Sequence, residues 1–303
     1  MPLRVLVSGA RGLIGSALLP RLRAGGHESS ALTRRATGPG EVGWDPAGGR
    51  LDARAIEGFD AVVHLAGEAI AARWTPARKA LIRESRVAGT RLLAGRLADL
   101  ERPPRVLISV SAIGFYGDRG DEVLDEASPP GVGFLPEVCR AWEEAAAPAA
   151  ARGIRVVHPR LGLVLTTRGG VLARLLPPFR LGLGGPLGDG RAWWSWVVLG
   201  DVIAVLERAL TDEGLAGPVN VVAPGAVTNR TFTRTLGRAL GRPAFLPVPA
   251  LALRALFGEM AEGAMLASAR VTPARLEVAG HSFRFPGLEA ALLHLLARRD
   301  EAA

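Results

Sequence analysis

Residues 5–15 read VLVSGARGLIG, and this stretch decides the fold of the chain. Its first residues predict a short buried strand, and the apolar pattern from Leu13 and Ile14 predicts a helix directly after it. Between them lie three glycines at a three-residue spacing: Gly9, Gly12 and Gly15. This order is typical of a dinucleotide-binding βαβ unit, in which glycines allow a tight turn, close approach of the backbone to a pyrophosphate and close helix packing. The helix N-terminus offers free N–H groups to the phosphates. The alternative is a tight turn that binds no ligand.

The first half of the chain predicts an α/β fold with a Rossmann-type, doubly wound parallel sheet. Short apolar runs alternate there with helical patterns. The expected strands cover residues 3–8, 28–33, 41–44, 60–65, 105–110 and 154–158. The expected helices cover residues 13–25, 75–99 and 136–151. Pro20 is expected to kink the first helix, because proline removes a helical hydrogen bond.

The pattern changes at residue 177, where a stretch rich in Gly, Pro and Trp predicts an irregular segment packed near a pocket. Beyond it we expect a helix over 197–210, a strand over 218–223, a helix over 229–241, a proline-rich extended stretch over 243–249 and an amphipathic tail over 250–297. We therefore predict a Rossmann domain over residues 1–240, including part of the substrate pocket from 177, and a small C-terminal substrate cap over 241–297.

Composition narrows the function classes. The chain has 303 residues, of which 49% are hydrophobic, so it can bury a large core. The single cysteine, Cys139, excludes an internal disulfide and fits a reducing cytoplasm, and the scattered histidines show no metal-ligand spacing. No apolar run is long enough for a membrane span, and the chain opens on a strand, which leaves no room for a signal peptide. We expect a cytoplasmic protein with no membrane partner.

The net charge of +8 does not predict a nucleic-acid partner. Lys79 is the only lysine, so nearly all the basic residues are arginines, and these are spread evenly along the chain without a basic block. The charge therefore reflects a general bias toward arginine, and we expect no nucleic acid among the partners.

The end of the second strand predicts which dinucleotide binds. NAD sites usually place a carboxylate there, roughly twenty residues after the glycines, to bind the ribose 2′-hydroxyl. Here the position is taken by Arg34 and Arg35 instead. Guanidinium groups bind a phosphate through charge-assisted bonds, and Arg11 in the glycine turn adds a third positive group. We predict NADP(H) rather than NAD(H); the alternative is that Arg34 and Arg35 are ordinary loop arginines.

Five segments resemble the short-chain dehydrogenase/reductase superfamily in its extended, epimerase-like branch. They are SGARGLIG (8–15), DAVVHLAG (60–67), ESRVAGTRLL (84–93), SVSAIGFYG (109–117) and HPRLGLVL (158–165). Within that branch the chain is most similar to the YfcH-like subfamily of epimerase-type proteins with unknown substrates, over residues 3–296. The resemblance implies a nicotinamide cofactor, a small-molecule substrate and a homodimer formed through the helices at 75–99 and 136–151.

The resemblance also implies roles for individual residues. Those placed at the cofactor, in addition to the glycine turn with Leu13 and Ile14, are Leu65, Ala66, Gly67, Arg86, Ser109 and Arg160. Arg86 would bring a positive charge toward the cofactor or an anionic substrate, or would be a surface arginine. Arg160 would lie at the nicotinamide end or form a salt bridge. Ser111 would bind a substrate oxygen, with Ser109, two residues earlier, as the alternative; both could instead be plain strand-end serines.

The usual catalytic pair of the superfamily is absent from the sequence. Its Tyr-x-x-x-Lys motif places a lysine beside a tyrosine, which then acts as acid or base. The only tyrosine here is Tyr116, and the only lysine, Lys79, lies 37 positions before it. The helix that should carry the pair has Leu135 or Pro136 and Cys139 or Arg140 at those positions. Proton transfer is left to Tyr116, the substrate or water, and packing or substrate contact is the alternative for Tyr116.

The segment at which extended members bind substrate contains Arg191, Trp194 and Trp196, which we expect to contact substrate, although core packing is the alternative for the indoles. Val198 and Gly200 depart from the His and Asp of the subfamily pattern. The sequence as a whole predicts an NADP(H)-binding, epimerase- or reductase-like enzyme acting on a small substrate. The alternative is an NADP(H)-binding sensor without turnover.

Overall fold

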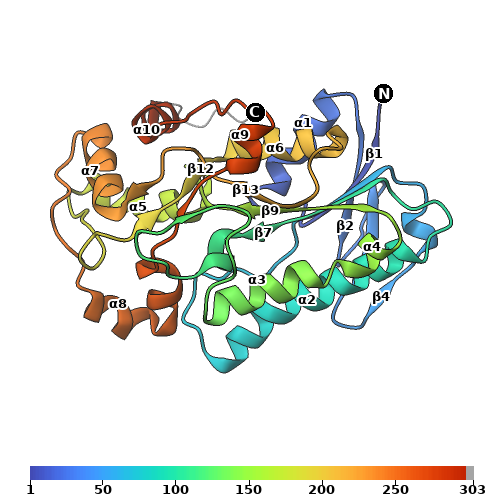
Figure 1. The fold of residues 1–303 in the computed structure, drawn as a ribbon, viewed down its shortest axis with the longest axis horizontal. Coiled ribbons are helices and arrows are strands. Elements are labelled where there is room, and N and C mark those ends of the chain that lie inside the picture. Colours follow the sequence, from blue (N-terminus) through green and yellow to red (C-terminus); the bar gives the residue numbers. More distant parts are fainter. Residues whose placement is uncertain (298–303) are drawn as a thin grey trace.

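The computed structural model describes residues 1–297, and these form an α/β fold around one nine-stranded sheet (Figure 1). Its strands are β1 (Arg4–Ser8), β2 (Glu28–Thr33), β3 (Glu41–Asp45), β4 (Arg50–Leu51), β5 (Ala61–His64), β6 (Val106–Ser109), β7 (Ser111–Ala112), β9 (Arg155–Leu161) and β13 (Gly217–Val221). They lie in the order β13-β9-β6-β5-β1-β2-β3-β4, with β7 also paired to β9. All neighbours are parallel except β3 and β4. The order reverses between β1 and β5, which confirms the doubly wound Rossmann-type sheet.

Helices cover both faces of the sheet because its strands are apolar on both. Val5, Val7 and Val63 face one way and pack with α1 (Gly15–Ala24) and α6 (Leu199–Thr211). Leu6 and Val62 face the other way and pack with α2 (Pro76–Ala98) and α4 (Ala147–Ala151). Successive strand residues point to opposite faces, so these alternating positions build two separate cores. In Figure 1, α2 and α3 (Phe134–Glu144) lie side by side on one of these faces.

The helices differ from the sequence prediction in two places. The single helix expected over 136–151 is broken into α3 and α4, because Pro148 lacks an N–H and cannot continue a helix across that turn. The segment expected to be irregular from residue 177 begins inside a helix, α5 (Gly170–Arg180), whose last turns include Pro177 and Pro178. The amphipathic tail expected over 250–297 consists of several short elements.

A third core lies at one end of the molecule, at the left in Figure 1, where α7 (Asn229–Leu240) and α10 (Leu288–Ala297) pack with α5. The other elements after β13 are β14 (Val227–Thr228), α8 (Ala250–Phe257), a π-helical turn (Ala261–Leu266), β15 (Arg270–Val271) and α9 (Ala274–Val278). Of these, α9 buries Leu276 in the core shared by α1 and α6. Phe232 of α7 and Leu292 of α10 are fully buried in the third core with Trp196 of β12 (Trp196–Val198). The helix α7, which we placed in the first domain, therefore shares its core with the tail. Among the described residues no helix combines the length and apolarity needed to cross a bilayer.

Candidate functional site

The glycine turn between β1 and α1 has the geometry that the sequence predicts. Gly9 has φ +65°, and a Cβ placed on it would lie 2.8 Å from the carbonyl carbon of Leu65. A Cβ on Gly15 would lie 2.7 Å from Cα of Ala10, so this glycine lets the helix start close to the strand. Gly12 N donates to Gly9 O at 2.9 Å, and Gly12 itself is exposed at the turn. The turn thus needs glycine for its own packing and presents bare backbone outward.

A buried pair, Ser8 and His64, holds the two strand ends that flank this turn. Ser8 Oγ lies 2.6 Å from His64 Nδ1 and accepts the backbone N–H of Leu65 at 3.1 Å. Burial lowers the pKa of His64 to about 4, so the imidazole is neutral. This pair fixes the Leu65 backbone beside Gly9. We did not predict this pair from the sequence, although Ser8 ends β1 at the glycine turn and His64 ends β5 in the segment DAVVHLAG (60–67).

Polar side chains line the carboxyl ends of the central strands, where ligands bind in doubly wound sheets. His64 of β5 pairs in register with Ser109 of β6, and Ser111 of β7 pairs with Arg160 of β9. Ser109 is fully buried and Ser111 is 2% exposed. Within the described chain, His64 Nε2 and Ser109 Oγ have no hydrogen-bond partner, and Ser111 Oγ finds none on nitrogen or oxygen. Buried polar atoms normally find partners, so a ligand or an ordered water is the partner that these atoms lack.

Arg86 lies beside the predicted adenosine-side backbone. Its Nη1 donates to the carbonyl of Glu68 at 2.9 Å, and a Cβ on Gly67 would lie 3.3 Å from its guanidinium carbon. The guanidinium also lies 5.0 Å from the ring centre of Trp142. Burial lowers the pKa of Arg86, and no carboxylate of residues 1–297 forms an ion pair with it. A half-buried cation whose hydrogen bonds go only to carbonyl groups is suited to an anionic group of a ligand.

The phenol of Tyr116 belongs to a buried polar network. It donates to Asn220 Oδ1 at 2.7 Å and accepts from Arg160 Nη1 at 3.0 Å. Arg160, 4% exposed, also forms two bonds of 2.8 Å to the carboxylate of Glu143 on α3 and lies 3.5 Å from the ring centre of Phe115. Burial raises the pKa of Tyr116, which opposes loss of its proton. Of the two alternatives for Arg160, the structure shows the salt bridge.

The only lysine lies elsewhere. Lys79 Nζ contacts both oxygens of Glu259, at 2.8 and 2.9 Å, and lies 4.8 Å from the ring centre of Phe134. Glu259 follows α8, so this lysine ties the C-terminal elements to the start of α2. Tyr116 and Lys79 therefore have separate sets of partners.

Cys139 occupies the interior beside Ser111. Burial, and after it the charge of Glu143, raises the pKa of its thiol to about 12, although Arg86 and the hydroxyl of Ser111 act in the opposite direction. The thiol thus stays protonated at neutral pH, which makes it a poor nucleophile. Its position shows that Ser111, Cys139 and Arg86 belong to one cluster.

The arginines predicted for the 2′-phosphate lie around the ends of β2 and β3. Arg34 and Arg35 are exposed in the turn after β2, and neither forms an ion pair within the described chain. Arg11 instead contacts Glu41 at the start of β3, at 3.0 Å. Glu41 also accepts the backbone N–H of Thr37 at 2.7 Å, and this bond, followed by that from Arg11, lowers the pKa of Glu41.

The segment that holds the predicted substrate residues lies just beyond the carboxyl end of β9, where Leu163 N donates to Ser195 O at 2.9 Å. Arg191 is 87% exposed and has Asp189 as its ion-pair partner at 4.0 Å. Trp194 packs against Phe232 with ring centres 5.1 Å apart, and Trp196, fully buried, donates to Gly225 O at 2.8 Å. The structure therefore shows core packing for both indoles, and their contact with substrate stays a prediction.

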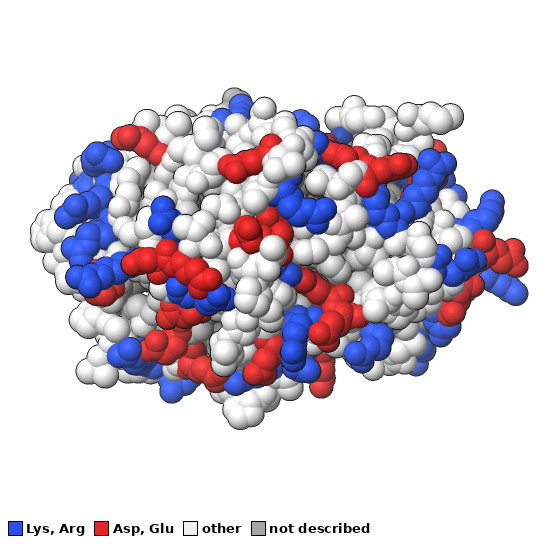
Figure 2. Space-filling model, in the orientation of Figure 1, with Lys and Arg blue, Asp and Glu red and all other residues white. Residues whose placement is uncertain are grey.

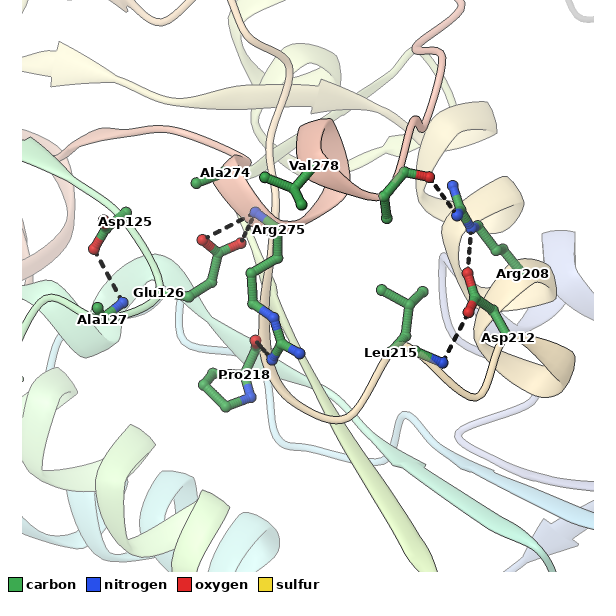
Figure 3. A pocket seen from close by; sticks show the side chains of 12 residues that line it. Asp125, Glu126, Ala127, Arg208, Asp212, Leu215, Pro218, Ala274, Arg275 and Val278 are labelled. Carbon is green, nitrogen blue, oxygen red and sulfur yellow. Dashed lines mark hydrogen bonds and ion pairs between the residues drawn. The ribbon is translucent and has the colours of Figure 1, made fainter.

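A pocket of about 710 Å³ lies at the opposite, amino end of β13 and is lined by parts of α6 and α9 (Figure 3). Its charged groups already have partners: Arg208 Nε bonds Asp212 at 2.7 Å, and Arg275 Nη1 donates to Pro218 O at 2.9 Å. The pocket shares no residue with the glycine turn or with the carboxyl ends of the strands. For these two reasons we do not assign the candidate site to it.

The sheet order and the glycine turn define a Rossmann fold of the short-chain dehydrogenase/reductase type. The chain belongs to the NAD dependent epimerase/dehydratase family, which matches residues 5–223. Residues 248–295 match a domain of unknown function, DUF1731. The resemblance to the extended, epimerase-like branch is thereby confirmed.

Relatives and solved structures agree with this assignment. The chain is 42% identical over 296 residues to the epimerase family protein MT2273 of Mycobacterium tuberculosis, covering 97% of this chain and 98% of that protein. The crystal structure of human epimerase family protein SDR39U1 (isoform 2) with NADPH is similar at a TM-score of 0.88 and 36% identity, covering 97% of this chain and 99% of that one. The nucleoside-diphosphate sugar epimerase from Corynebacterium glutamicum is similar at a TM-score of 0.82 and 40% identity; the match covers 98% of this chain but 58% of that one.

Proposed function

We propose that this chain binds NADP(H) and acts on a small carbonyl-bearing substrate as an epimerase- or reductase-like enzyme that works without the Tyr-Lys pair. The observation that carries the cofactor assignment is the end of β2, where Arg34 and Arg35 are exposed and form no ion pair within the described chain. Residues 31–40 contain no aspartate or glutamate, and the carboxylate of Glu41, which follows them, is bonded to Arg11 and Thr37. A 2′-phosphate would be attracted there, and the NADPH bound by the human relative supports the same choice.

The residues present fit a dinucleotide. The turn at Gly9, Gly12 and Gly15 offers bare backbone and the start of α1 to the pyrophosphate. Leu65, Ala66 and Gly67 would pass the adenosine half, held in place by Ser8 and His64. Leu13 packs on the glycine pair at 169–170, and Ile14 is the N-cap residue of α1, so both shape the turn. Bound nicotinamide would supply or accept a hydride.

Ser111 is our choice for the residue that binds the substrate oxygen. Its hydroxyl is buried, has no nitrogen or oxygen partner in residues 1–297 and lies at the carboxyl edge of the sheet. Ser109 has the same properties and stays the alternative. Arg86, next to Cys139 and Gly67, would bind an anionic group of the substrate or cofactor.

Tyr116 is a weak candidate for proton transfer, because its hydroxyl has two buried partners and its pKa is raised by burial. We assign Tyr116 and Arg160 to positioning, because their network joins β9, β13 and α3, and Arg160 pairs in register with Ser111. The proton would then come from the substrate or water.

The test is turnover of a panel of carbonyl compounds with NADPH and of nucleotide sugars with NADP⁺, which can accept the hydride that a transient oxidation of the sugar releases. Consumption of NADPH indicates a reductase, whereas inversion of a stereocentre without net consumption indicates an epimerase. We expect Ser111→Ala to lower kcat/KM by on the order of a hundredfold, as for loss of a donor to a developing oxyanion. A larger loss in Ser109→Ala than in Ser111→Ala would overturn the choice of serine.

A non-catalytic NADP(H) sensor is the second candidate. It is favoured by the positions of Tyr116 and Lys79, whose polar groups are both used in contacts within the protein. Tight NADPH binding with no turnover across the panel would support it. A homodimer through α2 and α3 stays a prediction, which light scattering can test.

A further inference from the structure

Arginines form a row along the exposed side of α7. Arg230, Arg234 and Arg238 follow one another at four-residue intervals, so they lie on one face of the helix, and Arg242 comes directly after its left-handed cap at Gly241. All four are exposed. Like charges at this spacing repel, and Arg230 in the first turn also opposes the helix dipole. The row therefore does not serve the stability of the helix.

The protein does not neutralise this row. Residues 214–258 contain five arginines and no aspartate or glutamate. On other helices an acid follows the arginine within one turn, as in Arg140–Glu144 and Arg208–Asp212. Arg238 has Glu289 at 3.9 Å, but both side chains are more than 60% exposed, and such pairs contribute little. Arg234 and Arg242 form no ion pair in the described chain. Figure 2 shows basic side chains gathered at the left edge, where Figure 1 places α7.

A groove lies beside this row of arginines. It has a volume of about 510 Å³ and is lined by Thr231, Arg234, Thr235, Arg238, Arg242, Ala244 and Phe245. The extended stretch after α7 folds back and forms its other wall, because Arg242 N donates to Gly237 O at 2.9 Å. A Cβ on Gly237 would lie 2.6 Å from that of Ala244, so only glycine admits this close approach. On this wall the ring of Phe245 is 71% exposed.

We propose that the groove is a second ligand site, which binds a phosphate-bearing molecule with a planar ring, of nucleotide size. Arginine forks form bidentate, charge-assisted bonds to phosphate, and an exposed aromatic ring offers a surface on which a planar ring stacks. The volume lies within the range of small-ligand pockets. All lining residues fall between 231 and 245, outside the segments that form the candidate dinucleotide site, so this proposal does not depend on the proposed function.

The test uses ADP as probe, titrated by calorimetry into the protein with one equivalent of NADPH present, which fills the dinucleotide site and leaves no excess to compete for the groove. We expect one ADP to bind, with an affinity that falls as salt rises. Arg234→Glu with Arg242→Glu should weaken binding by more than tenfold, since each removes bonds between charged groups. Arg152→Glu, an exposed arginine at the end of α4, is the control and should leave the affinity unchanged.

Two further probes separate phosphate from ring. Phe245→Ala should weaken ADP binding while leaving pyrophosphate binding unchanged, and adenosine should bind at least tenfold more weakly than ADP. The charge-reversed variant should melt no lower than the wild type, because it relieves repulsion along α7; if it fails to fold, Arg234→Gln with Arg242→Gln takes its place.

The proposal is overturned if ADP binds the wild type and the α7 variant equally, or if adenosine binds as well as ADP. It is also overturned if the wild type binds no ADP and light scattering shows a dimer for the wild type but a monomer for the variant. The groove would then be an interface between two copies of the chain. Binding of an acidic peptide to the groove, together with no binding of ADP, would likewise contradict a ligand of nucleotide size.

Discussion

The hydroxyl of Tyr116 donates its proton to Asn220 Oδ1 at 2.7 Å, which joins the loop after β7 to the edge strand β13. Asn220 in turn donates through its amide nitrogen to Thr272 O at 3.0 Å and through its backbone N–H to Glu126 at 2.9 Å. The only tyrosine of the chain is thus part of a structural connection between the sheet and the C-terminal segment. A proton already held in this way is poorly placed to move to a substrate.

Tyr116→Phe should therefore affect stability more than chemistry. It leaves Asn220 Oδ1 and one nitrogen of Arg160 without their partner in the interior, at a cost of about 1–3 kcal/mol in the free energy of unfolding. Urea denaturation measures this loss, and NADPH affinity should stay within about twofold of the wild type. A variant of full stability that loses all turnover would instead make Tyr116 the proton donor.

Glu143→Gln should be strongly destabilising, because it removes the charge that balances buried Arg160. The side chains of Arg160 and Glu143 are 4% and 13% exposed, and breaking such a pair typically costs about 3–5 kcal/mol. The neighbouring Glu144→Gln is a matched control, because its ion pair with Arg140 is exposed and should contribute less than about 1 kcal/mol. Equal denaturation midpoints for the two variants would contradict the role of this network.

Gly9→Ala and Gly26→Ala form a second matched pair. Both glycines have positive φ, +65° and +79°, so backbone strain should destabilise both variants by about 1–2 kcal/mol. Only at Gly9 does the added Cβ also meet the Leu65 backbone, at 2.8 Å, whereas nothing lies within 4 Å at Gly26. We expect Gly9→Ala to lower the melting temperature more than Gly26→Ala does. We also expect Gly9→Ala to abolish NADPH binding, measured by fluorescence, and Gly26→Ala to retain it. Retained binding in Gly9→Ala would contradict the assigned turn.

The neutral state of His64 predicts a dependence of stability on pH. Its pKa is about 4 in the folded chain and about 6.5 when unfolded, so the unfolded chain binds the extra proton between these values. Stability is complete above pH 6.5 and falls as pH drops toward 4, by about 3 kcal/mol from this residue. Denaturation at pH 7.5 and pH 5 should show the loss, and His64→Asn should reduce the difference between the two. An unchanged difference would mean that His64 is not the group that titrates.

The sheet could be predicted because its signal is local. Apolar runs such as 60–65 and glycines at fixed offsets depend only on neighbours in sequence, and the strands at β1, β2, β3, β5, β6 and β9 follow them closely. The break between α3 and α4 was missed because Pro148 also suits a first helical turn, and the sequence does not show that a new helix begins there.

The site was less predictable, since its contacts join distant residues. The Ser8–His64 pair spans 56 positions and the Tyr116–Asn220 bond spans 104. Glu143 was passed over because a glutamate on an amphipathic helix usually faces solvent; only the fold brings Arg160 beneath it. Trp194 and Trp196 were left between pocket and core for the same reason.

The central claim, that this chain prefers NADP(H), is tested most directly by the dissociation constants of NADPH and NADH for the wild type and for Arg34→Ala with Arg35→Ala. We predict that the wild type binds NADPH at least tenfold more tightly, that the variant loses this preference, and that its affinity for NADH stays nearly the same. Equal affinities of the wild type for the two dinucleotides, or a preference that survives in the variant, would contradict the account.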